Sequence, residues 1–400
     1  MLKGKNIVLG VTGSIAAYKA ADLASKLSQA GAILSVVMTK GAQEFVTPLT
    51  FRSITHRPVA TEMFDITSEF SVEHVALGEQ ADLVVIAPAT ANTIAKLAMG
   101  VADEMLSLTV LATRAPVILA PAMETNMYQD PATQDNLARL KERGFDIVGP
   151  SYGHLASGKE GLGRLVDIDE ILGAIRLVLG RGGDLAGRHI VVSAGGTQEP
   201  FDPIRHIGNR SSGKMGYAVA EAARDRGAKV TLVSAPTALP DPVGVGVIHV
   251  QTAIQMRDKV LDATHDADVL VMTAAVADYR PVATSEQKIK KDRADTLTLE
   301  LIRNPDILSE VKGDIVKVGF AAETAEKFME HGKEELDKKG LDLVCANDIT
   351  APDSGFGVDT NKVVIIGRSG EVEPLPLMLK IDVAHKILDK VVELLAQRGG

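Results

Sequence analysis

The sequence predicts an α/β protein made of two doubly wound, Rossmann-like domains. Short, continuous runs of Val, Ile and Leu alternate with amphipathic helical segments, and this series begins afresh near residue 189. Such runs are typical of parallel strands that are covered on both faces of a sheet. Aromatic residues make up only 4% of the 400 residues, so aliphatic side chains must fill the cores. A chain of this length has room for two or three domains, and the single restart favours two.

Apolar runs predict the strands of both halves, and the segments between them have helical periodicity. In the first half, strands are expected at residues 6–11, 33–38, 83–87 and 117–120, and helices at about 15–30, 93–98 and 132–143. In the second half, strands are expected at 189–193, 229–233, 269–273, 316–320, 341–346 and 363–366, with a helix at about 215–226. Residues 179–188 are rich in glycine and lack apolar periodicity. We therefore place the domains at residues 1–182 and 187–400.

Composition excludes several classes of protein. The formal net charge of −9 disfavours non-specific binding to nucleic acid or to an anionic membrane. No apolar stretch reaches the roughly 18 residues that a membrane helix needs, because Pro88 interrupts the best candidate, residues 83–95. The single cysteine, Cys345, allows no internal disulfide and no cysteine-rich zinc site. We expect a protein of a reducing compartment, the cytoplasm, with no nucleic-acid or membrane partner.

Polar groups follow three strands of the first half. After the first strand, Gly10 and Gly13 allow a tight turn, and Ser14 can cap the next helix while its hydroxyl and the free amides bind a phosphate. Thr39 follows the second strand, and hydroxyl and amide groups of residues 87–93 follow the third. The carboxyl ends of parallel strands meet at one edge of the sheet, which favours a nucleotide or flavin phosphate there. The alternative for the first motif is an ordinary glycine-containing turn into a capped helix.

The second half carries a different set of polar groups. Residues 193–220 contain the spacing of a phosphate-binding P-loop, but Met215 stands where Mg²⁺ binding requires Ser or Thr, so a kinase-like loop is rejected. Asp278 ends a strand, and Lys288 and Lys290 share one face of an extended segment. Charged loops of this kind are usually only solvated surface. The Gly-rich loop, the acidic strand end and the paired lysines together favour a nucleoside triphosphate.

In their order along the chain, these motifs resemble two related families. The first half is similar to the flavin-dependent cysteine decarboxylases. The chain from about residue 4 to about residue 390 resembles the bacterial bifunctional phosphopantothenoylcysteine decarboxylase/phosphopantothenate–cysteine ligases of coenzyme A biosynthesis. The resemblance implies an N-terminal flavoprotein domain, flavodoxin-like, that binds FMN. The residues implied for FMN are Gly13, Ser14, Thr39, Thr90, Asn92 and Ser107.

The same resemblance implies catalytic and substrate-binding residues in the first half. His74 would be the catalytic base, although an isolated histidine with apolar neighbours is more often structural. Residues 121–128 would form a loop that clamps the substrate, and residues 151–164 a glycine-rich flap that carries Ser157 as a further catalytic residue. The substrate-binding residues of the loop are Met123, Glu124, Asn126 and Met127.

Three residues depart from the pattern of that family, and the mildest change is Tyr128 in place of the more usual Trp. Its clamping loop usually carries Asn where this chain has Glu124, and an ionised Glu cannot donate a hydrogen bond to a substrate carboxylate. Glu124 would have to be protonated, or Asn126 would take its place, or the carboxylate would be held differently. The family's flap often carries a proton-donating Cys where this chain has Ser157. A hydroxyl is far less acidic than a thiol, so Ser157 would relay a proton from water.

By the same resemblance, the second half is a CTP-dependent ligase. The signatures are GNRSSGKMG, AAVADYRP, KIKK, RNPDIL, GFAAET and ANDI. Asn209 would orient the activated acyl group, Lys288 would neutralise phosphate charge, and Mg²⁺ at Asp278 would bridge the triphosphate. The substrate-binding residues implied are Arg205, Met272, Thr273, Ala274, Asp278, Lys290, Asn304, Pro305, Asp306, Ile307, Phe320 and Lys339. The expected substrates are 4'-phosphopantothenate, cysteine and CTP, and the expected assembly is a homododecamer of flavin-domain trimers and ligase-domain dimers.

Two alternatives come from other classes of protein. One is a chain with an active ligase half and a flavin-binding half that is impaired or only regulatory, because relatives of the flavin fold include non-enzymatic phosphatase regulators. The other is a nicotinamide-dependent oxidoreductase, which the α/β pattern alone would allow. It is disfavoured because neither half has G-x-G-x-x-G after its first strand.

Overall fold

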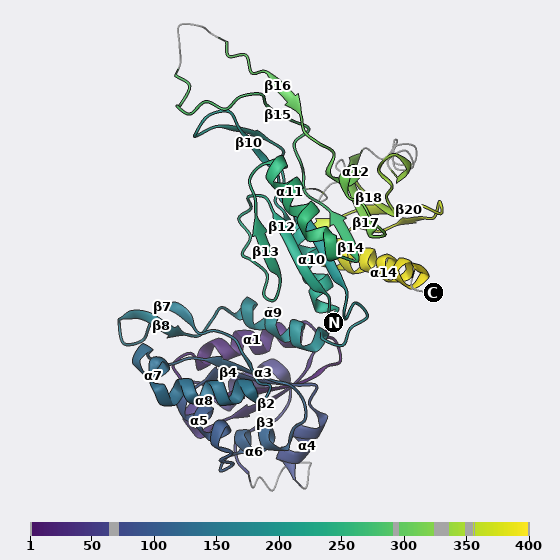
Figure 1. Cartoon of the computed structure of the whole chain (residues 1–400). Coiled ribbons are helices and arrows are strands. Elements are labelled where there is room, and N and C mark those ends of the chain that lie inside the picture. Colours follow the sequence, from purple (N-terminus) through teal and green to yellow (C-terminus); the bar gives the residue numbers. More distant parts are fainter. Residues whose placement is uncertain are drawn as a thin grey trace. The chain divides into compact units, whose positions relative to one another are not determined.

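The computed structural model describes residues 2–63, 72–290, 296–323, 336–348, 355 and 357–398. The chain divides into two compact units, Met1–Leu179 and Gly180–Gly400, and each unit has its own main sheet (Figure 1). The α/β class and the presence of two domains are confirmed.

The main sheet of the first unit has six parallel strands. In spatial order they are β3 (Val59–Ala60), β2 (Ile33–Met38), β1 (Asn6–Val11), β4 (Leu83–Ala89), β5 (Val117–Pro121) and β6 (Asp146–Ile147). The order 3-2-1-4-5-6 is that of a doubly wound Rossmann sheet. It differs from the flavodoxin order, 2-1-3-4-5, so the first unit is Rossmann-like in its topology. Because β1 has β2 on one side and β4 on the other, the loops after β1 and β4 diverge and leave a crevice at this point of the sheet.

Helices connect these strands. They are α1 (Ala17–Gln29), α2 (Lys40–Gln43), α3 (Pro48–Thr55), α4 (Glu73–Gln80), α5 (Ala91–Met99), α6 (Met105–Ala112), α7 (Thr125–Gln129), α8 (Pro131–Glu142) and α9 (Ile168–Gly180). Helix α1 buries one stripe of small and aliphatic residues that includes Leu23 and Leu27, the spacing that faces a core. Helix α6 packs against α4 and is apolar on nearly all sides, yet Leu111 on it is 66% exposed. Beyond β6, the predicted flap forms an antiparallel hairpin of β7 (Ser151–His154) and β8 (Glu160–Arg164).

The main sheet of the second unit has eight strands and is mixed. In spatial order they are β13 (Gly246–His249), β12 (Lys229–Ser234), β9 (His189–Ala194), β14 (Val269–Met272), β17 (Val316–Glu323), β18 (Leu343–Asp348), β20 (Val363–Gly367) and β21 (Val372–Pro374). The first six are parallel, and β20 and β21 are antiparallel to their neighbours. Strand β9 here has the position of β1 in the first unit, between the second strand in sequence, β12, and β14.

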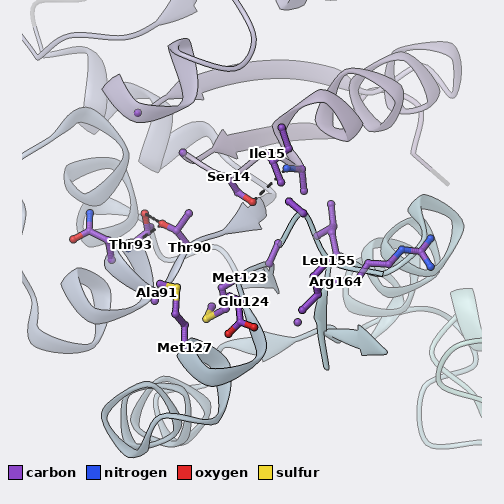
Figure 2. A pocket seen from close by; sticks show the side chains of 18 of the residues that line it. Ser14, Ile15, Thr90, Ala91, Thr93, Met123, Glu124, Met127, Leu155 and Arg164 are labelled. Atoms are coloured by element: carbon purple, nitrogen blue, oxygen red, sulfur yellow. Dashed lines mark hydrogen bonds between the residues drawn. The ribbon is translucent and has the colours of Figure 1, made fainter. Parts of the chain in front are cut away.

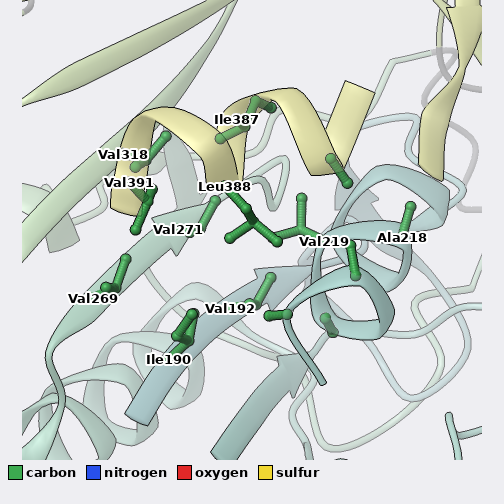
Figure 3. Close-up of a cluster of buried hydrophobic side chains, with 14 of the residues drawn as sticks. Ile190, Val192, Ala218, Val219, Val269, Val271, Val318, Ile387, Leu388 and Val391 are labelled. Atoms are coloured by element: carbon green, nitrogen blue, oxygen red, sulfur yellow. The ribbon is translucent and has the colours of Figure 1, made fainter. Parts of the chain in front are cut away.

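Helices cover both faces of this sheet. They are α10 (Lys214–Asp225), α11 (Ala253–Ala263), α12 (Ile307–Glu310) and α14 (Lys380–Arg398), with a short 3₁₀ turn, η1 (Thr264–Asp266). On one face, Leu388 and Val391 of α14 lie over Val192 of β9 and Val271 of β14, next to α10 (Figure 3). On the other face, α11 and α12 pack over the opposite side chains of the same strands. Both faces are therefore apolar, as the continuous aliphatic runs predicted.

Three two-stranded sheets lie outside the main sheet of the second unit. They are β10 (Gln198–Pro200) with β11 (His206–Gly208), β15 (Tyr279–Pro281) with β16 (Leu301–Arg303), and β19 (Thr360–Asn361) with β22 (Met378–Leu379). The first two extend the loops that carry the sequence motifs, and the third joins the start of α14 to the segment before β20.

An aspartate at the start of a strand fastens neighbouring strands at three places. In each, one carboxylate oxygen accepts the amide N–H of a residue in the adjacent strand. The pairs are Asp82 with Asn6, Asp268 with His189 and Asp342 with Lys317, each at 2.8 Å. The other oxygen binds a cation, respectively Lys5, Arg188 and Arg398. The two units thus begin their central strands in the same way.

The edges of both main sheets are short. In the described part of the chain the edge strands are β3 and β6, with two residues each, β13, with four, and β21, with three. Pro374, the last residue of β21, has no amide N–H to donate.

Candidate active sites

A cavity of about 730 Å³, which we call cavity 1, lies at the carboxyl ends of the strands of the first unit. Its lining comes from the turns after β1, β2 and β4, the loop after β5 and the β7–β8 hairpin (Figure 2). The predicted residues that line it are Gly13, Ser14, Thr39, Thr90, Asn92, Met123, Glu124, Met127 and Ser157. Residues that are far apart in the sequence are thus brought to one site.

Hydroxyl groups at cavity 1 organise the turns that carry them. Each accepts the amide N–H of a residue two or three positions further on: Ser14 from Ala16, Thr39 from Ala42, and Thr90 from Thr93, all at 3.3 Å. In this role Thr39 and Thr90 cap the helices α2 and α5. A hydroxyl that accepts a hydrogen bond keeps its own proton, so Ser14 and Thr39 can still donate to an anion in the cavity.

Thr12, which the sequence did not single out, joins the two sides of the crevice. Its Oγ1 donates to the carbonyl of Pro88 at 2.7 Å and accepts the amide N–H of Thr90 at 3.1 Å. The side chain is fully buried. Next to it, a Cβ on Gly13 would lie 3.0 Å from the backbone of Gly41, so this glycine lets the turns after β1 and β2 approach closely.

The predicted clamping loop, residues 121–128, lies directly against the hairpin. The amide N–H of Met123 donates to the carbonyl of Gly163 at 2.9 Å, and a Cβ on Gly161 would collide with the side chain of Thr125. The flap glycines therefore allow β8 to rest on the loop. Glu124 Oε2 accepts the amide N–H of Asn126 at 2.6 Å and caps α7. In this arrangement Glu124 is an acceptor, and Asn126 contributes its backbone to that contact.

Three charged residues of cavity 1 were missed by the sequence reasoning, because no motif or spacing marks them: Lys19, Glu104 and Arg164. Burial lowers the pKa of Lys19, and the nearby Arg164 lowers it further. Glu104 Oε1 is buried and has no hydrogen-bond partner among the described residues, although Lys96 Nζ forms an ion pair with it at 3.5 Å. With Glu124, the cavity has two cationic side chains and two carboxylates.

Three predicted residues of the first unit are not among the described residues that line cavity 1. His74 lies on α4. Ser107 is buried on α6, where its Oγ donates to the carbonyl of Glu104 at 3.0 Å. Asn126 lies on α7, one residue before Met127 of the lining. Their predicted roles stay predictions.

A second cavity, cavity 2, has a volume of about 880 Å³ and lies at the corresponding place of the second unit. Its lining comes from the Gly-rich loop before α10, the segment after β14, the start of α12, and strands β17 and β18. The predicted residues that line it are Asn209, Met272, Thr273, Ala274, Asp278, Asn304, Pro305, Asp306, Ile307, Phe320 and Lys339.

Hydrogen bonds fix the backbone around cavity 2. Ser193 Oγ, at the end of β9, accepts the amide N–H of Ala274 at 3.1 Å, and Thr273 Oγ1 donates to the carbonyl of Ser193 at 2.6 Å. Asn209 Nδ2 donates to the carbonyl of Val276 at 3.1 Å. Asn304 is buried and its Nδ2 donates to the carbonyl of Ala277 at 2.8 Å. Both asparagines therefore hold the segment that leads to Asp278.

The charge of cavity 2 is strongly unbalanced. Five cationic side chains line it: Arg210, Arg303, Lys338, Lys339 and Lys380. Among the described residues of the lining, the acidic ones are Asp278 and Asp306. Lys380 is 5% exposed, and burial, together with the nearby Lys214, lowers its pKa to about 8. A site with this surplus of positive charge suits a polyanionic ligand.

Arg205, Lys288 and Lys290 are not among the described residues of that lining. Arg205 Nη2 instead donates to the carbonyl of Ile289 at 2.8 Å, and the amide N–H of Ile289 donates to Asp202 Oδ2 at 3.3 Å. Asp202 also accepts Arg205 Nε at 2.8 Å, and Arg205 holds the pKa of Asp202 down to about 2. This pair, which we call the Asp202–Arg205 clamp, binds the backbone of Ile289, the residue between Lys288 and Lys290. The last lysine of the KIKK motif, Lys291, lies outside the described residues.

Within the described ranges, no three His, Cys, Asp or Glu side chains gather in a way that could hold a metal ion. No helix of the described chain is long and apolar enough to cross a membrane.

Comparison with known proteins assigns a family to each half. Residues 1–180 match the family described as Flavoprotein, and residues 185–395 match the one described as DNA/pantothenate metabolism flavoprotein C-terminal domain. These matches, with one cavity in each unit, define a flavoprotein fused to a pantothenate-metabolism domain.

Relatives share both halves. The coenzyme A biosynthesis bifunctional protein CoaBC of Vibrio vulnificus (strain YJ016) is 43% identical over 399 residues, which cover 98% of this chain and 99% of the relative. The protein of the same name from Bacillus subtilis (strain 168) is 44% identical over 406 residues, covering 100% of this chain and 99% of the relative. A crystal structure of the C-terminal domain of a CoaBC protein is 38% identical, covers 54% of this chain and 99% of its own, and has a TM-score of 0.47. The chain belongs to the family of coenzyme A biosynthesis bifunctional proteins.

Proposed function

We propose that the two halves of this bifunctional protein catalyse consecutive reactions. Residues 187–400 would join cysteine to 4'-phosphopantothenate with CTP, and residues 1–182 would decarboxylate the product to 4'-phosphopantetheine. The observation that carries this division is that each unit has its own cavity at the same point of its own sheet, one with balanced charge and one rich in cations. The first suits a cofactor with a large apolar part, and the second suits a triphosphate.

The ligase reaction would proceed in two steps. A carboxylate oxygen of 4'-phosphopantothenate attacks the α-phosphorus of CTP, and pyrophosphate leaves. The amino group of cysteine then attacks the acyl carbon of the acyl-cytidylate, the bond between that carbon and the phosphate oxygen breaks, and CMP and one proton are released. The cations of cavity 2 would neutralise the triphosphate, and Asn209, fixed by Val276, would orient the acyl group.

Mg²⁺ fits the acidic residues of cavity 2. This ion is commonly bound by one or two carboxylates together with substrate phosphates. Asp278 and Asp306 both line the cavity, and Asn304 anchors the segment before Asp278. We propose Asp278 as the residue that holds the ion against the triphosphate. The Asp202–Arg205 clamp would set the position from which Lys288 and Lys290 approach the phosphates.

FMN fits cavity 1. The hydroxyls of Ser14 and Thr39 would bind its phosphate, while Ile15, Met123 and Leu155 offer apolar surface to the ring system (Figure 2). When bound, FMN would supply a reversible hydride acceptor, so that oxidation of the substrate's CH₂–SH group creates the electron sink that loss of CO₂ needs. Ser157 of the flap would relay a proton to the product, and the flap itself would exclude water while it rests on the clamping loop.

A neighbouring subunit would complete cavity 1. His74 lies on α4, which packs against α6, and α6 exposes Leu111 although the helix is apolar nearly all round. Apolar helices of this kind are normally buried, so a second copy that covers α6 would also meet α4. We propose that His74 of one subunit serves as the base at cavity 1 of the next, within the trimer of the expected dodecamer.

Product analysis tests the main proposal. Purified protein should be yellow and should release CMP and pyrophosphate from CTP, 4'-phosphopantothenate and cysteine. If CMP release does not depend on cysteine, the ligase assignment fails. With synthetic 4'-phosphopantothenoylcysteine, mass spectrometry should find 4'-phosphopantetheine. Accumulation of the oxidised enethiol would mean that Ser157 cannot complete the reduction, and the absence of any CO₂ would favour a flavin-binding half that is only regulatory.

Mixed oligomers test the shared site. His74→Asn and Gly13→Val should each abolish decarboxylation, the first by removing the base and the second by filling the turn at cavity 1. If cavity 1 uses His74 of a neighbouring subunit, co-expressed variants should regain activity in the mixed oligomers that pair an intact cavity with an intact histidine. If the mixture is no more active than either variant alone, His74 serves the cavity of its own chain or has no catalytic role.

The compartment also belongs to this proposal. Cys345 is the only cysteine in the sequence and is fully buried, and burial raises its pKa well above the usual value for a thiol. A chain without a disulfide framework suits a reducing compartment, and we propose the cytoplasm.

A further inference from the structure

The carboxyl end of β18 and the segments beside it bring to cavity 2 polar residues that are not among the predicted phosphate-binding residues. Asn347, near the end of β18, pairs in register with Val363 of β20. Two residues before Val363, Asn361 pairs with Met378, just before Lys380 begins α14. Asn347, Asn361 and Lys380 all line cavity 2. The predicted phosphate ligand Lys339 and its neighbour Lys338 also line the cavity and precede β18 in the chain.

Lys380 presents a buried cation at this place. Its side chain is 5% exposed, and Nζ donates to the carbonyl of Gly355 at 2.8 Å and to the carbonyl of Val358. An ammonium group has three donors, so these two contacts leave one for a ligand. The carboxylate that favours the charged form of Lys380, Asp359, already forms an ion pair with Lys214 at 2.7 Å. Lys380 is therefore a cation whose neighbouring anion is engaged elsewhere.

Asn347 presents an acceptor in the same part of the cavity. Its Oδ1 is buried and has no hydrogen-bond partner in the described chain. A buried polar atom left without a partner is costly, so in a native protein it calls for a partner such as a water, an ion or a ligand. An acceptor of this kind suits an N–H group. A buried cation and a buried acceptor that line the same cavity match the two ends of an α-amino acid.

We propose that this end of cavity 2 binds the amino acid substrate, with the carboxylate on Lys380 and the amino group on Asn347 Oδ1. The proposal rests on the ligase function proposed above and adds to it the residues that select the amine. In the second step, Asn347 would hold one N–H while the nitrogen lone pair attacks the acyl carbon. The new N–C bond replaces the C–O bond to the phosphate, CMP leaves with the bonding electrons, and the amine loses one proton to solvent.

Recognition of the carboxylate has a chemical purpose in this enzyme. The flavoprotein half is proposed to remove that carboxylate later, so an amine that lacks it would give a product that bypasses decarboxylation. Cysteamine is such an amine, because it has the thiol and the amino group of cysteine without the carboxylate. A cation in the amine subsite is the feature that would distinguish the two substrates.

Competition between cysteine and cysteamine in the ligase reaction tests the assignment of Lys380. In the full-length wild-type protein, kcat/KM should be higher for cysteine by about 10- to 100-fold, the effect of one hydrogen bond to a charged group. In Lys380→Gln, kcat/KM for cysteine should fall by that factor while kcat/KM for cysteamine stays nearly unchanged. Equal losses with both amines would mean that Lys380 only supports the structure, and the proposal would be wrong.

Lys214→Gln is the matched control. Lys214 Nζ donates to the carbonyl of Gly357 at 2.9 Å and pairs with Asp359, so it holds the same stretch of chain as Lys380. Lys214 is not among the described residues that line cavity 2. Combined with Asp359→Asn, so that the released carboxylate cannot pair with Lys380, its loss should loosen that stretch without changing the preference for cysteine over cysteamine. A change of preference as large as that of Lys380→Gln would contradict the subsite.

Asn347→Ala tests the acceptor. Because both amines carry the N–H group, this variant should raise KM for cysteine and for cysteamine alike, with little change in pyrophosphate release during a single turnover of CTP and 4'-phosphopantothenate without amine. If Asn347→Ala instead raises KM for CTP alone, the oxygen serves the nucleotide, and its assignment to the amine is wrong.

The wild-type protein offers a test without substitution, in case the variants fold poorly. The charged groups that act on Lys380 are Lys214 on α10 and Asp359, and with burial they place its pKa at about 8. The preference for cysteine should be largest near pH 7 and should fall as the pH rises above about 8, because Lys380 loses its charge. A preference that is constant through this range would overturn the proposal.

These measurements separate the two proposals. If no pyrophosphate is released from CTP and 4'-phosphopantothenate, the ligase function itself fails. If pyrophosphate is released but Lys380→Gln does not change the preference for cysteine over cysteamine, only the proposed amine subsite is wrong.

Discussion

The two units build their cavities on the same frame and differ in what surrounds it. In the first unit, Thr12 at the end of β1 bonds to the turn after β4, and in the second, Ser193 at the end of β9 bonds to the segment after β14. Both hydroxyls stand where the strand order reverses, and both fix the two sides of the crevice. The loops then set the charge, which is balanced in cavity 1 and strongly positive in cavity 2. The sheet determines where the cavity lies, and the loops determine which ligand it can bind.

The largest expected effect is the loss of decarboxylation, an activity of the first unit, without any loss of ligation, the activity of the second. His74→Asn should lower decarboxylation by about 10²- to 10⁴-fold, the contribution of a general base, and should leave CTP-dependent ligation unchanged. His56→Asn is a suitable control, because His56 has a left-handed backbone (φ 55) that Asn also adopts. Both activities are measured on the same preparation by product mass. Parallel losses of decarboxylation and ligation would contradict separate sites.

A smaller effect is expected from two glycines beside the strands that carry the two hydroxyls. A Cβ on Gly216 of α10 would lie 2.5 Å from Thr273 Oγ1 and 2.6 Å from the Cβ of Ala194, both in rigid surroundings. A Cβ on Gly10 of β1 would meet mainly the tip of Leu106, which can move. Gly216→Ala should therefore destabilise the second unit by about 1 to 3 kcal/mol, and weaken CTP binding.

Gly10→Ala is the companion variant and should cost less than Gly216→Ala. Urea unfolding and calorimetric titration with CTP check both expectations. A Gly10→Ala protein that is destabilised as much as Gly216→Ala would show that Leu106 is as rigid as the backbone around Gly216.

The Asp202–Arg205 clamp exists only in the second unit and gives a local prediction. Asp202→Asn removes the charge that binds Arg205, so the segment around Ile289 should detach more often. Trypsin should then cleave after Lys288 and Lys290 several-fold faster, and ligation should slow while decarboxylation does not change. Asp241→Asn, at an exposed pair with His249, is the control. Unchanged cleavage would contradict a positioning role for Asp202.

The clamp also predicts an acid dependence. Arg205 lowers the pKa of Asp202 from its ordinary value near 4 to about 2, so the native state binds this proton less readily than the unfolded chain. The stability contributed by Asp202 is fully present above pH 4 and is lost as the pH falls toward 2. Faster cleavage of the segment around Ile289 should therefore appear in this window with an acid-active protease.

The smallest effect compares the aspartates that start the central strands. Asp268 binds Arg188 at 2.9 Å, whereas Asp82 binds Lys5 at 3.4 Å, and the side chains of both pairs are partly exposed. Each also accepts a backbone amide, so Asp82→Asn and Asp268→Asn should each cost about 1 kcal/mol, with Asp268→Asn the larger. Denaturant unfolding of the two variants checks the order, and the reverse order would contradict the assignment.

The central strands could be predicted closely from the sequence because burial on both faces produces unbroken aliphatic runs. The strands β1 and β2 begin and end at the predicted residues. Strand β18 begins two residues later than expected. Leu341 and Asp342 are both buried just before the strand, Leu341 as an apolar residue and Asp342 because its carboxylate accepts the amide N–H of Lys317. Short hairpins such as β10–β11 and β15–β16 were not predicted, since strands of three residues have no periodicity to detect.

The candidate sites were predictable where motifs follow strands, and less so elsewhere. Thr90 directly follows β4, Ser14 and Asp278 lie in the segments after β1 and β14, and the cavities are found there. Asp202 and Lys380 belong to none of the quoted signatures, and Asn347 lies in the ANDI signature without having been assigned a role. The partner of Asp202, Ile289, is 87 residues away, and Lys380 reaches cavity 2 only because β19 and β22 join its segment to β20. Such contacts depend on tertiary structure, which local patterns do not encode.

The short edge strands have a consequence for behaviour at high protein concentration. An exposed edge is a template on which strands of other chains can add, and longer edges make longer templates. Strands of two to four residues offer few amide and carbonyl groups, and Pro374 removes one of the donors. Association between copies should therefore use helical surfaces such as α6, and the described sheets should contribute little to amyloid-like growth.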